Sequence, residues 1–444
     1  MRPGRLPSWL LILPYLFIGL LPLLLAAAAQ GRERSVAGEL AVGAGLVALA
    51  MLLMQFITSG RNRRISRHAG SDTTLRFHQL TAFGLFAMVL LHPVLFMLPG
   101  SWEELGQLPR RLMMMGSSAR LRSGVIALVL LAALIPMGLW RTRLPLRYEL
   151  WRASHMVLAL AAAIASVHHA VSTGAYSGTP ALMSAWLLLG MAALGSVAYV
   201  YLIKPILLKR SAYRVKLNRQ AGEGIRELVL EPAHERRLSY EAGQFVWVSF
   251  GRWAFPLNDH PYSLASSPRE GGELSLMIKA RGDFSSAMAA IPVGETAFVD
   301  GPYGDFRLGA SEARVIALYA GGIGIAPILG ILRELQAAKD KRTVRLVYGA
   351  RNLDRLVGRD IIEGVERSLD FRRDYVLEEP PADWQGSAGA ITPSIVLRAI
   401  AGDDPQQCLC MICGPTPMMQ AIERVLLDAG VPPANIIYER FEYD

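Results

Sequence analysis

The segment LRFHQLTAFGLFAMVLLHPVLFML, residues Leu75–Leu98, combines a membrane-spanning length with two ionisable side chains. It exceeds the about 20 apolar residues that a helix needs to cross a bilayer. It also carries His78 and His92, although ionisable groups at membrane depth are rare and normally face a bundle interior. Because 92 − 78 = 14 residues is close to four helical turns, the two imidazoles share a face and lie about 21 Å apart. The segment therefore predicts a spanning helix with one histidine near each membrane edge.

A second apolar segment, Ala153–Val171, repeats this arrangement, with His155 near one end and His168 and His169 near the other. Neutral imidazole suits iron, and a haem fits between the helices of a bundle. A lone membrane histidine more often hydrogen-bonds to a neighbouring helix, but matched pairs on two helices favour metal centres. Zinc is disfavoured because no cysteine or carboxylate lies near these depths. The two segments predict two bis-histidine b-type haems stacked across the membrane.

The outer ligand on the second segment has two candidates. His168 and His169 are adjacent, so they cannot both be axial ligands of one iron from the same helix. Strict helical phase favours a spacing of 14 residues from His155, which points to His169, whereas a spacing of 13 points to His168. The residues alone leave the choice open.

The 444 residues allow two or three domains, and the 52% hydrophobic content is unevenly distributed. Residues 1–208 are dominated by apolar runs, while 209–444 resemble an ordinary soluble sequence. The first run is longer than the 7–15 residues of a signal-peptide core, which favours a retained helix. Six spans are predicted, at about 9–29, 38–58, 75–98, 123–140, 153–172 and 181–203.

The formal charge of +9 does not indicate a nucleic-acid partner, because the basic residues of the first half lie mostly between apolar runs. The positive-inside rule explains them and predicts an inner (plasma) membrane protein with both termini in the cytoplasm. His78 and His155 are then on the inner side. The three cysteines match neither a disulfide framework nor an iron–sulfur spacing, which indicates a reducing compartment for the second half; they are Cys408, Cys410 and Cys413.

From Tyr213 the chain consists of short alternating runs, which predict an antiparallel barrel of about 100 residues. The motif HPYSLASS begins at His260 and Pro261, and it places Tyr262 and Ser263 where they can stack on a flavin and hydrogen-bond to its N5 edge. The segment Lys279–Ser286 has a glycine turn entering a helix. Its free N–H groups suit a pyrophosphate, and its candidate contacts are Lys279, Gly282, Ser285 and Ser286.

From Arg314 strands and helices alternate, which predicts a parallel α/β sheet. The turn GGIGIAP, with Gly322 and Gly324, follows an apolar strand and opens a helix, as a nucleotide-binding turn requires. Arg351 follows the next strand, at a position where a side chain can contact a ribose 2′-phosphate. The alternative is that Arg351 is a solvated loop arginine. Asp354 lies nearby, and a carboxylate there favours an unphosphorylated ribose. A later strand ends in Cys413, Gly414 and Pro415, where ligands of open sheets bind, although Cys413 also fits a buried structural thiol.

These motifs carry a family likeness. The second half resembles the ferredoxin–NADP reductase family, with HPYS at the flavin motif, GGIGIAP at the nucleotide turn, CGP at the nicotinamide and an aromatic near the C-terminus. Joined to a six-helix, four-histidine membrane domain, it resembles the NADPH oxidase and ferric reductase superfamily in its compact bacterial form. The resemblance implies that His78 and His155 hold an inner haem, and that His92 and His168 hold an outer one.

The resemblance further implies that Tyr443, or Phe441 if the register differs, covers the flavin face, and that Cys413 acts at the nicotinamide. It implies three domains: a membrane domain at 1–210, an FAD-binding barrel at 211–308 and an NAD(P)H-binding α/β domain at 309–444. No EF-hand pattern is present in the sequence, so calcium gating of that type is not expected.

The expected activity is transfer of electrons from cytoplasmic NADPH through FAD and two haems to an external acceptor. The loop 99–122 offers a positive rim of Arg110, Arg111, Arg120 and Arg122, which suits superoxide and an anionic ferric chelate equally, or lipid phosphate. Because that loop is short and has no ligand-rich insertion, oxygen is favoured over a ferric chelate. A transporter with a histidine proton relay and a regulatory nucleotide domain is the alternative of another class. No protein partner or oligomeric state is indicated.

Overall fold

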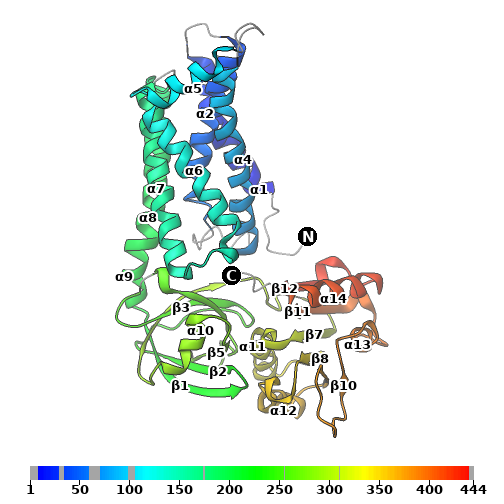
Figure 1. The fold of residues 1–444 in the computed structure, drawn as a ribbon. Helices are drawn as coiled ribbons and strands as arrows, with labels where there is room; N and C mark the ends of the chain where they lie inside the picture. Colours follow the sequence, from blue (N-terminus) through cyan, green and yellow to red (C-terminus); the bar gives the residue numbers. More distant parts are fainter. Residues whose placement is uncertain are drawn as a thin grey trace. The chain divides into compact units, whose positions relative to one another are not determined.

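We describe the protein from a computed structural model, which describes residues 9–29, 35–59, 71–98, 106–173, 176–254, 256–309 and 311–439. The chain divides into two compact units, and the division falls between Ile203 and Lys204. Each unit is considered by itself. The first is helical, and the second contains two β-sheets (Figure 1).

The helical unit is built from long runs of leucine, alanine and valine. Five of the described helices are long and apolar enough to cross a membrane, and the apolar part of a sixth, Ile12–Ala28, is shorter. The helices are α1 (Trp9–Ala28), α2 (Val36–Gln55), α4 (Ser71–Met97), α5 (Leu108–Ser117), α6 (Arg122–Leu139), α7 (Tyr148–Thr173) and α8 (Pro180–Ala198), which continues into a π-helical turn, Tyr199–Ile203. All six predicted spans are therefore helical.

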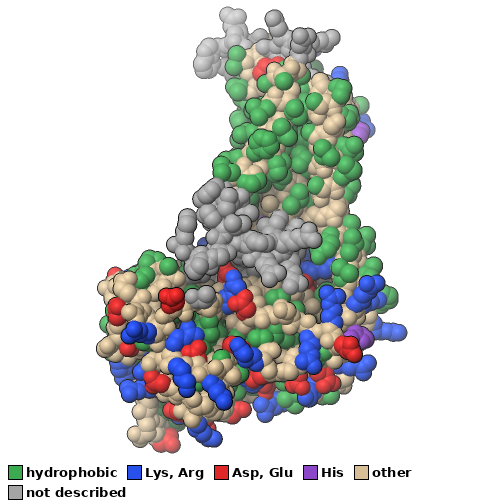
Figure 2. Space-filling model, turned by 180° about the vertical axis from the view of Figure 1, so that it is seen from behind, with side chains coloured by type: hydrophobic (Ala, Val, Ile, Leu, Met, Phe, Trp, Pro, Cys, Tyr) green, Lys and Arg blue, Asp and Glu red, His purple; other side chains and the backbone are tan. Residues whose placement is uncertain are grey.

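Helix α2 forms much of the core of this unit, packing along α4, α1, α8 and α7. Its alanines and glycines allow close approach, as is typical where helices meet in a bilayer. Large apolar side chains elsewhere point outward, such as Leu187 on α8 at 63% exposed and Ile164 on α7 at 70%. Figure 2 shows hydrophobic side chains over the helical unit, whereas charged side chains gather on the other unit. This distribution is the one that a lipid-facing surface requires.

The second unit begins with a short helix, α9 (Lys204–Lys209), and a six-stranded antiparallel sheet of order β4-β3-β6-β1-β2-β5. An isolated bridge between Leu264 and Leu276 joins the two ends of this order and partly closes the sheet into a barrel. A five-residue helix, α10 (Asp283–Ala287), precedes β6. The strands are β1 (Tyr213–Gly222), β2 (Ile225–Pro232), β3 (Phe245–Phe250), β4 (His260–Ser263), β5 (Leu274–Lys279) and β6 (Thr296–Tyr303).

A six-stranded parallel sheet follows, of order β10-β9-β8-β7-β11-β12. The chain moves outward from β7 in one direction, then returns to the other side at β11, so the topological switch point lies between β7 and β11. The strands are β7 (Val315–Gly321), β8 (Thr343–Ala350), β9 (Phe371–Leu377), β10 (Ser387–Ala388), β11 (Cys408–Cys413) and β12 (Ile436–Glu439).

Helices cover both faces of this sheet, as its fully apolar central strands require. Alternate residues of β7 point to opposite faces, with Leu318 in the core under α11 (Ile325–Ala337) and α12 (Arg359–Glu366). Tyr319 lies in the core under α13 (Pro393–Arg398) and α14 (Thr416–Asp428). The predicted order of helical bundle, antiparallel barrel and parallel α/β sheet is confirmed.

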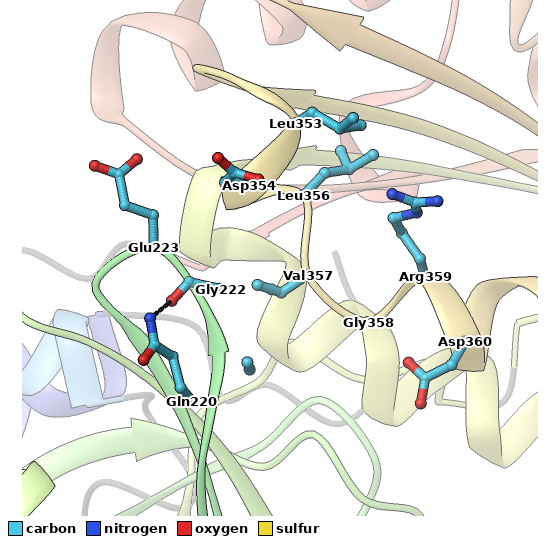
Figure 3. Close-up of a pocket in the computed structure, with 11 residues that line it drawn as sticks. Gln220, Gly222, Glu223, Leu353, Asp354, Leu356, Val357, Gly358, Arg359 and Asp360 are labelled. Atoms are coloured by element: carbon cyan, nitrogen blue, oxygen red, sulfur yellow. Dashed lines mark hydrogen bonds between the residues drawn. The ribbon is translucent and has the colours of Figure 1, made fainter.

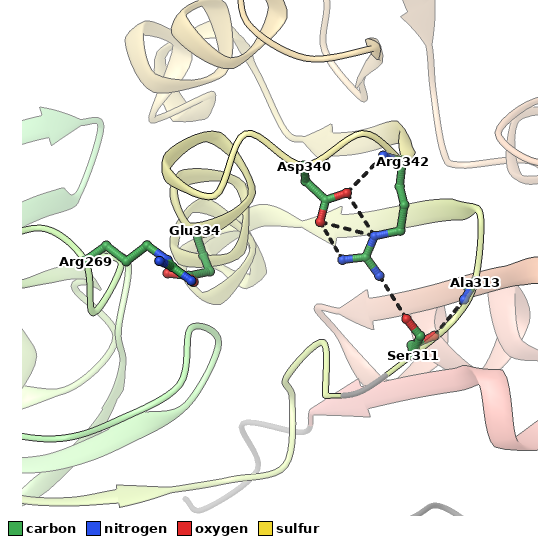
Figure 4. A network of polar contacts seen from close by, with 6 residues as sticks. All are labelled: Arg269, Ser311, Ala313, Glu334, Asp340 and Arg342. Carbon is green, nitrogen blue, oxygen red and sulfur yellow. Dashed lines mark hydrogen bonds and ion pairs between the residues drawn. The ribbon is translucent and has the colours of Figure 1, made fainter.

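The barrel and the α/β sheet share one apolar core, to which the barrel contributes Ala265 and Phe306. On α11, Gly330 lies so close to the barrel that an added Cβ would come within 2.6 Å of the Leu264 carbonyl oxygen. Figure 4 shows Arg269 of the barrel reaching Glu334 on the same helix, with 2.7 Å between Nε and Oε1. The helix that follows the nucleotide turn is thus packed directly behind the flavin motif.

Candidate active site

The outer histidines come together between α4 and α7. The ring centres of His92 and His169 are 6.2 Å apart, and the ring planes cross at 84°. An imidazole nitrogen binds a transition metal at about 2 Å and lies about 1 Å from its ring centre, so two imidazoles that shared one metal would have ring centres up to about 6 Å apart. The observed separation matches that requirement. His168 is exposed, whereas His169 is half-buried.

The hydrogen bond of His92 assigns the roles of its two ring nitrogens. Nδ1 lies 2.7 Å from the carbonyl oxygen of Ala41 on α2. A carbonyl oxygen only accepts, so Nδ1 carries the proton and Nε2 keeps its lone pair. A carbonyl partner of this kind fixes the ring orientation of metal-binding histidines. His92 is therefore prepared to bind a metal through Nε2.

Two glycines make room for the outer rings. A Cβ added at Gly45 on α2 would lie 2.6 Å from Nδ1 of His92, and one at Gly124 on α6 would lie 2.7 Å from Cε1 of His169. No side chain larger than hydrogen fits there unless the ring moves. Neither glycine was identified from the sequence, although small residues where membrane helices meet are a known pattern.

The inner histidines, His78 and His155, are half-buried on the same two helices and lie within electrostatic reach of each other. Trp151 stacks on His155 with 5.4 Å between ring centres, and its indole N–H donates to the carbonyl oxygen of Met137 at 2.8 Å. This fixed indole holds the His155 ring in place. The Gln55 amide nitrogen lies 3.4 Å from the carbonyl oxygen of His78 and ties that turn of α4 to α2.

The buried ring nitrogens fit a metal-binding group. Nδ1 has no hydrogen-bond partner among the described residues in His78, His155 and His169. A buried polar nitrogen without a partner is costly, and a metal coordinated through that same nitrogen would offset the cost. Among the described residues there is no cluster of three or more histidine, cysteine or acidic side chains that would suit a different metal site. The four histidines would thus suit two haems, each with a pair of imidazoles as ligands.

The predicted flavin motif lies on β4, paired with β3. His260 stacks on Phe284, with 3.8 Å between ring centres and 21° between planes. Ser263 is buried, and its hydroxyl has no partner among the described residues. A buried hydroxyl left without a partner is uncommon and suits a bound polar ligand. Tyr262 is half-buried beside Ser263 on the same strand.

In the predicted phosphate-binding segment, Lys279–Ser286, several backbone N–H groups are already hydrogen-bonded within the segment. The Ser285 hydroxyl accepts hydrogen bonds from the backbone N–H groups of Arg281 and Gly282, at 2.9 and 3.0 Å. The N–H of Ser286 donates to the Gly282 carbonyl oxygen at 2.9 Å. Two of the expected anion-binding N–H groups are therefore engaged by Ser285, while Lys279 is exposed at the end of β5.

The two nucleotide motifs meet at the switch point of the parallel sheet. An added Cβ at Gly324 would lie 2.2 Å from the Cys413 carbonyl oxygen, and one at Gly414 would lie 3.0 Å from Cα of Gly321. Gly322 has φ +53°, a conformation that favours glycine. The structure thus brings the GGIG turn and the CGP turn, which ends at Pro415, into contact where open α/β sheets bind ligands.

Cys413 ends β11 and is fully buried. Burial raises the pKa of its thiol well above the usual value, and the neighbouring Glu439 raises it further. The thiol is therefore protonated at neutral pH and is not a nucleophile. It pairs in register with Glu439 on β12, and its complete burial is that of a structural thiol. Tyr443 and Phe441 lie outside the described residues.

Arg351, predicted to meet a ribose 2′-phosphate, lies in an exposed loop after β8. Its Nε and Nη2 each lie 2.9 Å from Oε1 of Glu379. Arg355 in the same loop is paired with Glu223 of the barrel at 3.0 Å. Arg351 and its neighbour Arg355 are therefore both engaged by carboxylates.

The structure also contains a buried ionic cluster at the barrel that no pattern in the sequence predicted. Lys204 at the start of α9 pairs with Asp300 on β6, and both side chains are under 10% exposed. The Tyr303 hydroxyl donates to Asp300 at 2.9 Å and accepts from Lys204 at 3.2 Å. The cluster fixes α9 to the barrel.

Comparison with known protein families gives three matches along the chain. Residues 44–166 match the ferric reductase like transmembrane component, 227–307 match an FAD-binding domain and 318–424 match the oxidoreductase NAD-binding domain. The chain is therefore an integral membrane oxidoreductase that uses FAD and NAD(P)H. Its three domains together form the architecture of the NADPH oxidase and ferric reductase superfamily.

Individual relatives match the second unit. NADH-cytochrome b5 reductase 1 of Ajellomyces capsulatus is 30% identical over 185 residues, which is 40% of this chain and 59% of the relative. The enzyme of the same name from Emericella nidulans is 32% identical over 186 residues, 39% of this chain and 59% of the relative. The matched part of the chain thus covers less than two thirds of the length of these relatives. Among solved structures, the cytochrome b5 reductase domain of Ulva prolifera nitrate reductase aligns with a TM-score of 0.45 and 20% identity, covering 51% of this chain and 96% of that domain.

Proposed function

We propose that the chain carries electrons from a cytoplasmic reduced nicotinamide nucleotide across a membrane to an acceptor on the far side. Bound FAD would supply the conversion of a hydride into single electrons, and two b-type haems held by the membrane histidines would supply the path through the bilayer. The observation that carries the proposal is the pairing of His92 with His169 at a separation suited to two axial ligands. His169 takes the place that the family resemblance implied for His168.

The proposed roles of the protein's own groups follow from their positions. His78 and His155 hold the inner haem, and His92 and His169 hold the outer one. Ser263 donates to the flavin edge, and the Gly322 and Gly414 turns bind the nucleotide at the switch point. Six spans with both termini in the cytoplasm place the nucleotide site beside the cytoplasmic NAD(P)H pool, in accordance with the positive-inside rule.

The proposed acceptor is oxygen, which is reduced by one electron to superoxide. Two arginines of the segment between α4 and α6 support this choice by their positions. Arg111 donates to the carbonyl oxygen of Leu98 at 3.1 Å, just beyond α4, and Arg120 donates to that of Thr173 at 3.3 Å, the last residue of α7. Positive charge therefore lies at the outer ends of both histidine-bearing helices, where it would stabilise a developing anion.

Ferric-chelate reduction is the second candidate, because the membrane-domain match is to a ferric reductase like component. The two acceptors use the same electron path and the same positive rim. The short described loop around α5 carries no ligand-rich insertion to hold a bulky chelate, which favours oxygen.

The test begins with visible spectra of the purified protein before and after addition of NADH or NADPH. A Soret band that shifts on reduction supports the electron path, and its absence would favour a histidine relay of the transporter type. Cytochrome c reduction that superoxide dismutase suppresses identifies oxygen as the acceptor. Dismutase-insensitive reduction, with fast turnover of ferric citrate without oxygen, would identify a ferric reductase.

A further inference from the structure

The loop after β8 lies where a bound nucleotide presents its adenosine ribose. Gly349 of β8 pairs in register with Gly321 of β7, which opens the nucleotide turn, and Arg351 follows two residues later. In dinucleotide-binding folds, residues after the neighbouring strand contact the ribose 2′ position, an acidic residue for NADH or an arginine for NADPH. The segment Arg351–Arg355 is thus the part of the chain at which the two nucleotides would differ in their contacts.

This loop is held by a residue of the other domain, at the turn between β1 and β2. Nε and Nη2 of Arg355 donate to the two carboxylate oxygens of Glu223, at 3.0 and 3.3 Å. The Asn352 amide donates to the same carboxylate at 3.2 Å. The carboxylate therefore occupies the bidentate face with which an arginine would bind a phosphate.

The turn that carries Glu223 is seated firmly against the loop. The Glu223 N–H donates to the Asp354 carbonyl oxygen at 3.0 Å, and a Cβ at Gly222 would lie 2.5 Å from that same oxygen. In Figure 3 the Gly222–Glu223 turn faces Leu353–Asp360 across a hollow of about 590 Å³. Hydrogen bonding to Arg355 lowers the pKa of Glu223, so the carboxylate is charged at neutral pH.

The charge around the loop disfavours a further anion. Arg351, Arg355 and Arg359 supply three positive charges, and the first two each have a carboxylate partner. The Glu379 N–H also donates to the Arg351 carbonyl oxygen at 2.7 Å, which holds that pair together. With Asp354, Asp360 and Glu378 also nearby, five acidic side chains surround the loop against three basic ones. A 2′-phosphate would have to displace a carboxylate from an arginine and then remain beside it.

We propose that Glu223 is a specificity-determining residue: by holding Arg355, it makes the site select NADH over NADPH. This inference rests on the proposed function, since it concerns the nucleotide that supplies the electrons. It revises the expectation of NADPH, which followed from Arg351 in the sequence. The selecting carboxylate comes from the FAD domain, 132 residues before the arginine it holds.

The test measures kcat/KM for NADH and NADPH with the purified full-length protein and ferricyanide as acceptor. The wild type should favour NADH by at least fivefold. Glu223→Gln keeps an oxygen acceptor for Asn352 but removes the charge that holds Arg355. It should raise the NADPH/NADH ratio of kcat/KM at least tenfold, mainly through a lower KM for NADPH. Adding Arg355→Ala to Glu223→Gln should remove that gain.

The matched control is Glu273→Gln, which breaks an exposed Lys216 pair elsewhere on the barrel and should leave the ratio unchanged. A wild type that favours NADPH overturns the proposal, as does an unchanged ratio in Glu223→Gln or a gain that survives Arg355→Ala. If Glu223→Gln fails to retain FAD, Glu379→Gln tests the same idea at Arg351, where the ratio should also rise.

Calorimetry with two fragments separates this proposal from the proposed function. The probes are 5′-AMP and adenosine 2′,5′-bisphosphate, titrated into the wild type and into Glu223→Gln. The wild type should bind 5′-AMP more tightly, and the variant should gain affinity for the bisphosphate. If neither fragment binds the wild type, the nucleotide site and the proposed function fail. If both bind with a preference that Glu223→Gln does not alter, only the role of Glu223 fails.

Discussion

The imidazole rings of His92 and His169 lie nearly perpendicular to each other, with 6.2 Å between their centres and 84° between their planes. They come from helices α4 and α7, and each ring is packed against a glycine of a third or fourth helix, Gly45 or Gly124. Four helices therefore define this one site, and its geometry leads directly to two predictions.

Removing a ring of this pair should remove one haem. We expect His92→Ala and His169→Ala each to lower the haem content from two to one per chain, because a single axial imidazole no longer holds the iron between two helices. Pyridine haemochrome absorbance measured against FAD content checks this. His168→Ala is the control and should keep both haems, since that side chain is exposed. Loss of haem in His168→Ala with none in His169→Ala would reverse the assignment.

Filling the glycine positions should have the same effect as losing a ring. Gly45→Ala places a Cβ 2.6 Å from Nδ1 of His92, so the ring must move from the Ala41 carbonyl that orients it. We expect at least half of the outer haem to be lost. Gly190→Ala on α8 is the control, because nothing lies within 4 Å of its added Cβ. Equal haem content in the two variants would show that the close contact is not required.

The partnerless hydroxyl of Ser263 should contribute to flavin reduction. Ser263→Ala removes a hydrogen bond worth about 1 kcal/mol, which corresponds to a roughly fivefold slower step if the bond strengthens as the flavin is reduced. Stopped-flow bleaching of the flavin absorbance after mixing with NADH measures that step. Ser394→Ala, at an exposed position on α13, should leave the rate unchanged. A Ser263→Ala rate equal to wild type would separate this hydroxyl from the flavin.

The contact between α11 and the barrel should reverse the usual effect of replacing a helical glycine. Glycine to alanine inside a helix normally stabilises by about 0.5–1 kcal/mol. At Gly330 the added Cβ would lie 2.6 Å from the Leu264 carbonyl oxygen, and overpacking of this kind costs about 1–3 kcal/mol. Gly330→Ala should therefore lower the midpoint of thermal unfolding followed by flavin fluorescence. Gly364→Ala on α12, whose nearest neighbour is at 3.8 Å, should raise it.

The buried Lys204–Asp300 pair should matter far more than an exposed pair. Asp300→Ala leaves the Lys204 ammonium buried without its carboxylate, which costs about 3–5 kcal/mol. Glu273→Ala breaks the exposed pair with Lys216 and should cost about 0–1 kcal/mol. Urea unfolding of both variants, followed by release of the flavin, compares them. Similar midpoints would mean that water reaches the Lys204 side chain in solution.

Much of this protein was predictable from its sequence because the determining features are local. Apolar length predicts the spanning helices, and helical phase places His78 and His92 on one face. Glycine turns after apolar strands predict the nucleotide site, since strand, turn and helix are adjacent in the chain. The order of the three domains follows from the order of these patterns, and the family matches confirm it.

Other features depend on contacts between distant segments, and only the tertiary structure decided them. Whether His168 or His169 faces inward depends on how α7 is rotated against α4 and α6. The need for glycine at positions 45 and 124 becomes visible only in the folded structure, where an imidazole ring from another helix lies beside each of them. The neighbouring sequence of Glu223 does not indicate a role for its carboxylate, because its partner Arg355 is 132 residues away and reaches it only in the folded protein. Local patterns act through residues a few positions apart, whereas these contacts arise from the packing of whole helices and domains.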